Sequence, residues 1–184
     1  MTADLLSGNH FEIFGLPARF ALDQEQLAER YRELQRAVHP DRYANAGAQE
    51  RRLAVQRAAQ INEAFQVLRD PLARAKYLLE LHGVQVDDGQ NTAMDPVFLM
   101  EQMELREALS EVRGHAEPQA ALARLFQDIS ARIQDLTALL GGELDRATPD
   151  ALRQARDNVR KLQFLGRLRE EALELEADLE EGLG

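Results

Sequence analysis

The tripeptide His39-Pro40-Asp41 constrains the fold of this chain more than any other short stretch. Apolar residues precede it at helical spacing, and the helix that they predict from about Asp23 has to end at Pro40. Proline lacks an N–H and disfavours the helical conformation of the residue before it. A second helical pattern runs from Ala54 to Leu68. The sequence therefore predicts an antiparallel helical hairpin with the tripeptide at its tip.

Two shorter helices are predicted on either side of this hairpin. The first begins after Asn9, a favoured helix cap, and ends near Gly15, while Asp23 caps the hairpin's own first helix. The other follows Asp70-Pro71 and ends at His82-Gly83, where it forms a connecting helix. A polar stretch from Asp87 to Asp95 then separates the two halves of the chain.

The second half carries three amphipathic helical patterns. They cover about 95–112, a segment around Leu122 to Leu140, and Pro149 to about Glu180. Three such helices on short loops predict a three-helix bundle. We therefore expect an all-α protein with an N-terminal helical-hairpin domain over residues 1–83 and a C-terminal bundle over residues 84–184.

Composition agrees with a helical protein and excludes thiol chemistry. The 184 residues are 45% hydrophobic but only 5% aromatic, and they include no cysteine. Helix formers dominate, and no alternating strand pattern occurs. Disulfides, cysteine nucleophiles and thiolate metal sites are excluded, so the chain could not hold an iron–sulfur cluster by its own thiolates.

Charge is distributed unevenly along the chain. Residues 1–80 contain 11 Lys or Arg and 11 Asp or Glu, whereas residues 81–184 contain 11 and 21, which accounts for the net charge of −10. An acidic balance argues against nucleic acid as a partner. No segment is apolar enough to span a membrane, and the N-terminus resembles neither a signal peptide nor a transit peptide. We therefore expect a cytoplasmic protein.

The helix predicted from about residue 95 has too many apolar residues for one buried stripe. At about 100° per residue, Phe98 and Leu105 fall on one face with Leu109 and Val112, whereas three other apolar residues point away from it. These are Leu99, Met100 and Met103, which share their side with Glu104 and Glu107. Exposed Leu and Met among carboxylates indicate a docking surface. Burial against the N-terminal domain or in a dimer is the alternative.

Phe164 presents a similar choice. It lies next to the apolar stripe of the last helix but roughly 100° away from it, so it could line the edge of the docking surface. It could equally be a satellite contact of the core.

The hairpin resembles the J-domain family. The residues that carry the resemblance are the His-Pro-Asp tip, the basic face of the preceding helix and the helix ending Ile61-Asn-Glu-Ala-Phe-Gln-Val-Leu-Arg-Asp-Pro71. In that family the tip docks on a DnaK-type ATPase and stimulates ATP hydrolysis. The resemblance implies that the chaperone-binding residues of this chain are His39, Pro40, Asp41, Arg30, Arg32, Arg36 and Arg42.

The whole chain resembles the HscB-type co-chaperones of iron–sulfur cluster biogenesis. Phe98-Leu-Met-Glu-Gln-Met-Glu-Leu-Arg-Glu107 opens the bundle, and Val159-Arg-Lys-Leu-Gln-Phe-Leu165 lies in its last helix. The resemblance implies that the bundle holds the cluster scaffold IscU and that the J-domain presents it to the chaperone HscA. The scaffold-binding residues would be Leu99, Met100, Met103, Glu104, Glu107 and Phe164. Met103 stands where Leu is usual and Arg42 where Lys is commoner, and both changes preserve the chemical character.

We expect an adaptor and not an enzyme. The sequence contains no phosphate-binding glycine loop, nucleophile–base pair or metal-spaced cluster, and so no cofactor or metal is expected. A catalytic pair of His39 and Asp41 is a possible alternative, but a turn tip lacks the pocket that acid–base chemistry needs. A general J-protein that delivers unfolded clients is another alternative. Such proteins commonly carry Gly/Phe-rich or zinc-binding segments, which this chain lacks.

Overall fold

A computed structural model describes residues 8–43, 46–86 and 95–181, and every regular element in these ranges is helical. The all-α prediction is confirmed. The chain divides into two compact units, Met1–His82 and Gly83–Gly184.

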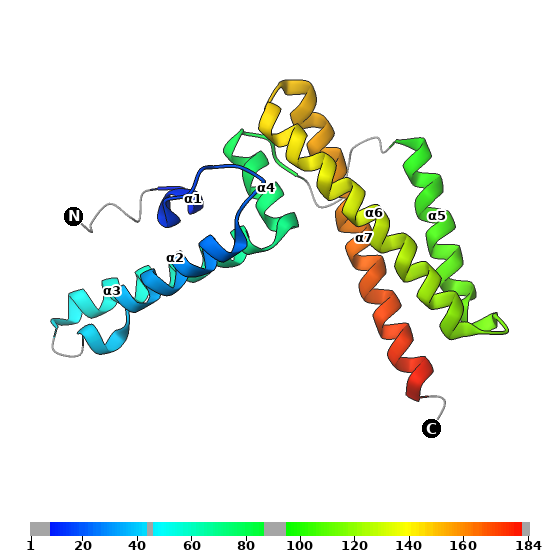
Figure 1. The fold of residues 1–184 in the computed structure, drawn as a ribbon, viewed down its shortest axis with the longest axis horizontal. Helices are drawn as coiled ribbons and strands as arrows, with labels where there is room; N and C mark the ends of the chain where they lie inside the picture. The colour runs from blue at the N-terminus through cyan, green and yellow to red at the C-terminus, as the bar shows by residue number, and fades with distance from the viewer. Residues whose placement is uncertain (1–7, 44–45, 87–94, 182–184) are drawn as a thin grey trace. The chain divides into compact units, whose positions relative to one another are not determined.

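The N-terminal unit is built around the predicted hairpin. Its α-helices are α1 (His10–Phe14), α2 (Gln24–Ala37), α3 (Ala48–Arg69) and α4 (Pro71–Leu81). Helices α2 and α3 lie side by side, and the chain reverses direction between them (Figure 1). Between them, residues Pro40–Tyr43 form the 3-10 turn η1.

Helix boundaries in this unit follow local capping chemistry. The Asn9 side chain accepts a hydrogen bond from the Glu12 N–H, and the Glu12 side chain accepts one from the Asn9 N–H, which completes a capping box. Asp23 accepts from two N–H groups in the first turn of α2. Asp70 ends α3 and caps α4 through the Ala73 N–H at 2.6 Å. The first two caps were predicted from the sequence and are confirmed.

A buried apolar core holds the hairpin and α1 together. The side chains of Phe11 and Leu27 are fully buried, as is Leu68 on α3. Tyr31 of α2 stacks on Phe65 of α3 with ring centroids 4.1 Å apart, and its hydroxyl donates to the side-chain carbonyl oxygen of Asn62 at 2.9 Å. These contacts hold α2 and α3 together and thereby position the turn between them.

Arg74 fixes the junction between α3 and α4 from inside the core. Its guanidinium donates to the Leu68 carbonyl at 2.5 Å and lies 4.9 Å from the centroid of the Phe20 ring. Burial lowers the pKa of Arg74, and the charge of Asp70 opposes this change. The carbonyl that it binds belongs to the last turn of α3, so Arg74 satisfies an acceptor that the helix leaves open.

The C-terminal unit is the predicted bundle. It contains α5 (Pro96–Glu111), the short 3-10 turn η2 (Val112–Gly114), α6 (Pro118–Arg146) and α7 (Pro149–Glu181). Helices α6 and α7 form a long hairpin (Figure 1), and α5 is in contact with both of them. No helix of the described residues is long and apolar enough to cross a membrane.

The bundle core lies between all three helices. Phe98 and Leu105 of α5 pack with Ile129 of α6 and with Leu165 and Leu168 of α7. A second cluster closes the other end around Val112, which is 1% exposed. The buried face that the sequence predicted for α5 is confirmed. This packing leaves the opposite face of α5 outside the core.

We expect the stability of the N-terminal unit to fall under mild acid because of His10. Its ring stacks on Tyr77 at 4.2 Å, and its backbone N–H donates to the Tyr77 hydroxyl. Burial lowers the pKa of His10 below its ordinary value of 6.5, and the charges of Glu63 and Glu80 oppose this. The unfolded chain therefore binds the proton more tightly. The stabilisation is complete above the unfolded pKa and is lost as the pH falls through the folded pKa.

Denaturant midpoints of wild type and His10→Phe at about pH 7.5 and about pH 5.5 measure this effect. Phenylalanine keeps the stacking on Tyr77 but does not titrate. The variant should lose less stability than wild type between the two pH values. Equal losses in the two proteins would contradict the role assigned to His10.

Candidate functional site

The His39-Pro40-Asp41 segment forms a turn in which the His39 and Asp41 side chains are exposed. Helix α2 ends at Ala37, and the Arg42 N–H donates to the His39 carbonyl at 3.0 Å. The His39 and Asp41 side chains are 59% and 90% exposed, and the His39 Nδ1 and Asp41 Oδ2 atoms are 3.5 Å apart. The Asp41 N–H also lies 3.3 Å from the same ring nitrogen. The two side chains are held near each other, and both are exposed to solvent.

Basic side chains lead along α2 toward this turn. Arg30, Arg32 and Arg36 are all exposed, and so is Arg42 within the turn itself. Arg30 pairs with Glu33 at 3.1 Å. Within residues 8–43 and 46–86, no ion pair to Arg32, Arg36 or Arg42 is found. An acidic partner surface could therefore reach these cations without displacing an existing contact.

The exposed face of α5 forms the second candidate site. Leu99, Met100 and Met103 are 44%, 64% and 72% exposed, and Glu104 and Glu107 beside them are exposed as well. We call these five residues the α5 surface. The bundle does not bury any of them. Large apolar side chains held in solvent next to carboxylates are suited to binding a partner that is both apolar and basic.

Phe164 does not lie on this surface, so the prediction that it lines the edge of the docking surface is wrong. Its side chain is 5% exposed, and its ring packs edge-on against Phe98 with centroids 5.9 Å apart. Helix α7 packs against α5 as well as α6, so its buried face is wider than a single stripe. The satellite-core alternative describes Phe164 correctly. The residue supports α5 from the core side.

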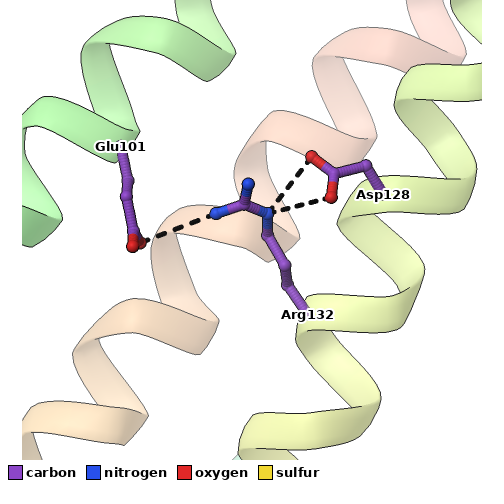
Figure 2. Close-up of polar contacts among 3 residues, drawn as sticks. All are labelled: Glu101, Asp128 and Arg132. Carbon is purple, nitrogen blue, oxygen red and sulfur yellow. Dashed lines mark hydrogen bonds and ion pairs between the residues drawn. The ribbon is translucent and has the colours of Figure 1, made fainter.

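Ion pairs hold both sides of α5 against its neighbours. Figure 2 shows Arg132 of α6 between Glu101 of α5, at 3.6 Å, and Asp128 of its own helix, whose carboxylate oxygens both lie 3.1 Å from the Arg132 Nε. On the other side, Arg106 pairs with Glu171 of α7 at 3.5 Å. Each pair is worth little alone in solvent. Together they favour the rotation of α5 that directs the α5 surface outward.

Known proteins match both halves of this chain. Residues 9–77 match the DnaJ domain, and residues 94–173 match the family described as the HSCB C-terminal oligomerisation domain. A Co-chaperone protein HscB homolog from Shewanella sp. (strain ANA-3) is 45% identical over 168 residues, which is 91% of this chain and 97% of that protein. The chain belongs to the HscB co-chaperone family.

Solved HscB structures share the fold. Chaperone HscB from Vibrio cholerae superposes with a TM-score of 0.83 at 44% identity, over 94% of this chain and 99% of that one. The human co-chaperone protein HscB gives a TM-score of 0.84 at 27% identity, over 92% and 83%. The resemblance identified from the sequence is confirmed. The chain is thus a J-domain co-chaperone, and its J-domain implies a DnaK-type chaperone as partner.

A polar cavity of the HscB bundle was missed by the sequence analysis. It has a volume of about 340 Å³ and lies beside Phe98. Its wall includes Glu143, which is 6% exposed and accepts from the Asn158 amide at 2.9 and 3.0 Å. The sequence signal that could have indicated this cavity is the charged residue Glu143, which lies three positions after Leu140 on the buried stripe of α6. Acidic and basic side chains both line the cavity, so its charges largely compensate one another.

The described part of this HscB chain shows no arrangement suited to a metal ion. Within residues 8–43, 46–86 and 95–181, no three His, Asp or Glu side chains are grouped so that they could hold one. The two candidate sites are the exposed turn with its arginines and the α5 surface.

Proposed function

We propose that this HscB-family chain binds an iron–sulfur scaffold protein of the IscU kind and delivers it to a DnaK-type chaperone of the HscA kind during cluster assembly and transfer. It would stimulate the ATPase of that chaperone and work in the cytoplasm. The observation that carries the proposal is the α5 surface. It offers exposed apolar and acidic side chains in the half of the chain that matches the C-terminal domain of HscB.

The chemistry of the α5 surface supports a protein client. Leu99, Met100 and Met103 provide the apolar contact, and methionine side chains adapt to irregular partner surfaces. Glu104 and Glu107 would pair with basic residues of the scaffold and favour its correct orientation. The net charge of the chain, −10, also favours a basic contact region on the scaffold. Phe164 would contribute indirectly, by supporting α5 from beneath.

The exposed turn supports the second half of the proposal. His39, Pro40 and Asp41 would touch the chaperone, and the exposed arginines would attract its acidic surface. Because the turn belongs to the N-terminal unit and the α5 surface to the C-terminal unit, the two partners would be bound by different units of the chain. Such a division is what an adaptor that presents one protein to another requires.

Calorimetric titration of the full chain tests this function. A folded IscU-like scaffold should bind with one site per chain, whereas a permanently unfolded reference protein at the same concentration should bind much more weakly. The physical reason is that a preformed apolar and acidic surface suits one complementary folded surface. Equal affinity for both ligands would favour a general J-protein over a dedicated adaptor.

A further inference from the structure

Val97 is an exposed apolar residue at the beginning of α5 that belongs to neither candidate site described above. Its side chain is 63% exposed, close to the 64% of Met100. Its N–H donates to the Asp95 side chain at 3.1 Å, which fixes the backbone in the first turn of the helix. The helix backbone therefore sets the direction of the Val97 side chain.

Local stability does not account for a valine at this position. Valine forms helices less readily than alanine because its branched side chain loses rotamer freedom. A side chain that is 63% exposed also gains little from packing within its own unit. The apolar group would instead gain stability from burial by another molecule.

Val97 continues the α5 surface by one turn. Residues three apart on a helix are neighbours, so Val97, Met100 and Met103 form one row along α5. Met103 lies six positions after Val97, so the row extends over about 9 Å along the helix axis at 1.5 Å per residue. Leu99 lies beside it, one turn before Met103. The apolar part of the face is therefore an elongated ridge, wider than an isolated pair of methionines.

Charged contacts lie along both sides of this ridge. The Arg132 contacts shown in Figure 2 hold Glu101, which follows Val97 by one turn, against α6. Arg106 is held against Glu171 of α7 on the other side. Glu104 and Glu107 continue toward the C-terminal end of α5 and are exposed. Along the exposed face of α5, the apolar row from Val97 to Met103 is thus followed by the acidic residues Glu104 and Glu107.

We propose that Val97 is a fourth apolar contact for the scaffold protein and that the scaffold binds α5 in one defined orientation along the helix axis. An apolar patch of the scaffold would cover the row from Val97 to Met103, and its basic side chains would lie toward Glu104 and Glu107. This inference rests on the proposed function, because the occupant is the same scaffold. Its supports are the continuity of the row with the α5 surface and the exposed carboxylates of Glu104 and Glu107 that follow it along α5.

The test is the affinity of the full chain for an IscU-like scaffold, with three variants. Val97→Ala should weaken binding between about threefold and about tenfold, as expected for the loss of two buried methyl groups. Val97→Ile keeps a branched apolar side chain and should bind like wild type. Leu173→Ala is the matched control, because Leu173 of α7 is 50% exposed but outside the row, and it should leave affinity unchanged.

Denaturant midpoints and Met103→Ala separate the possible failures. If Val97→Ala binds like wild type while Met103→Ala binds more weakly, the role of Val97 is refuted and the proposed function remains. If wild type itself does not bind the scaffold, the proposed function fails. If Val97→Ala lowers the denaturant midpoint together with affinity, its effect is structural and the contact role is refuted.

Discussion

Replacement of Asp41 by alanine is expected to abolish stimulation of the chaperone ATPase without changing the denaturant midpoint of the protein. The Asp41 side chain is 90% exposed, and it forms an ion-pair contact with His39, which is itself exposed. An exposed side chain without a structural role contributes little to stability, so its loss should be felt only by a partner. A steady-state ATPase assay with an HscA-like chaperone measures this directly.

Glu29→Ala provides the control for this prediction. Glu29 is an exposed acidic residue of α2 and belongs to neither candidate site. Its removal should leave stimulation close to the wild-type value. Full stimulation by Asp41→Ala would mean that the tip does not act on the chaperone, and the chaperone-binding assignment of His39 and Pro40 would fall with it.

The second large effect is expected at the α5 surface. Leu99→Ala combined with Met103→Ala should weaken scaffold binding by about 1–2 kcal/mol for each residue, because a few apolar anchors usually carry most of the interface energy. The same double variant should keep the wild-type denaturant midpoint, since both side chains are exposed. Calorimetric titration and a denaturant curve on the same preparation measure the two effects.

Phe164→Ala should have the opposite effect, a loss of stability. Truncation of a buried phenylalanine costs about 3–5 kcal/mol of stability, so the midpoint should fall strongly. Weaker scaffold binding by this variant would then follow from a disturbed α5. An unchanged midpoint for Phe164→Ala, or a large loss of stability in the Leu99/Met103 double variant, would reverse the assignment of core and surface.

The helices of both units could be predicted because the decisive signals are local. Proline and cap residues set the helix ends, as at Asp23 and Pro149, and the spacing of apolar residues sets the buried face. The outward position of Leu99, Met100 and Met103 followed from the same spacing. The exposed fractions of these side chains agree with that prediction.

The burial of Phe164 could not be predicted from the apolar stripe of α7 alone. A helix that packs against two neighbours has two partly overlapping buried faces, and the phase within α7 does not show where α5 will lie. The contact with Phe98, more than sixty positions away in the chain, decides the burial of this residue. Tertiary packing of this kind is not encoded in any single helix.

The ion pairs beside α5 could likewise be predicted only in part, because some of them join different helices. Asp128 and Arg132 are four residues apart, so their contact on one helix was open to prediction. The reach of Arg132 to Glu101, and that of Arg106 to Glu171, depends on how the helices are placed. The cavity beside Glu143 depends on all three helices. The partners that we propose were inferred from family resemblance and not from these geometric features.

The most direct test of the account is the chaperone ATPase rate, measured with and without scaffold, in the presence of wild type or the Leu99→Ala/Met103→Ala double variant. Both proteins should stimulate the chaperone equally when the scaffold is absent, because the tip is unchanged. Adding scaffold at a concentration that saturates wild type but not the variant should raise the rate further only with wild type. An equal scaffold-dependent increase with the double variant would contradict the claim that the α5 surface delivers the scaffold.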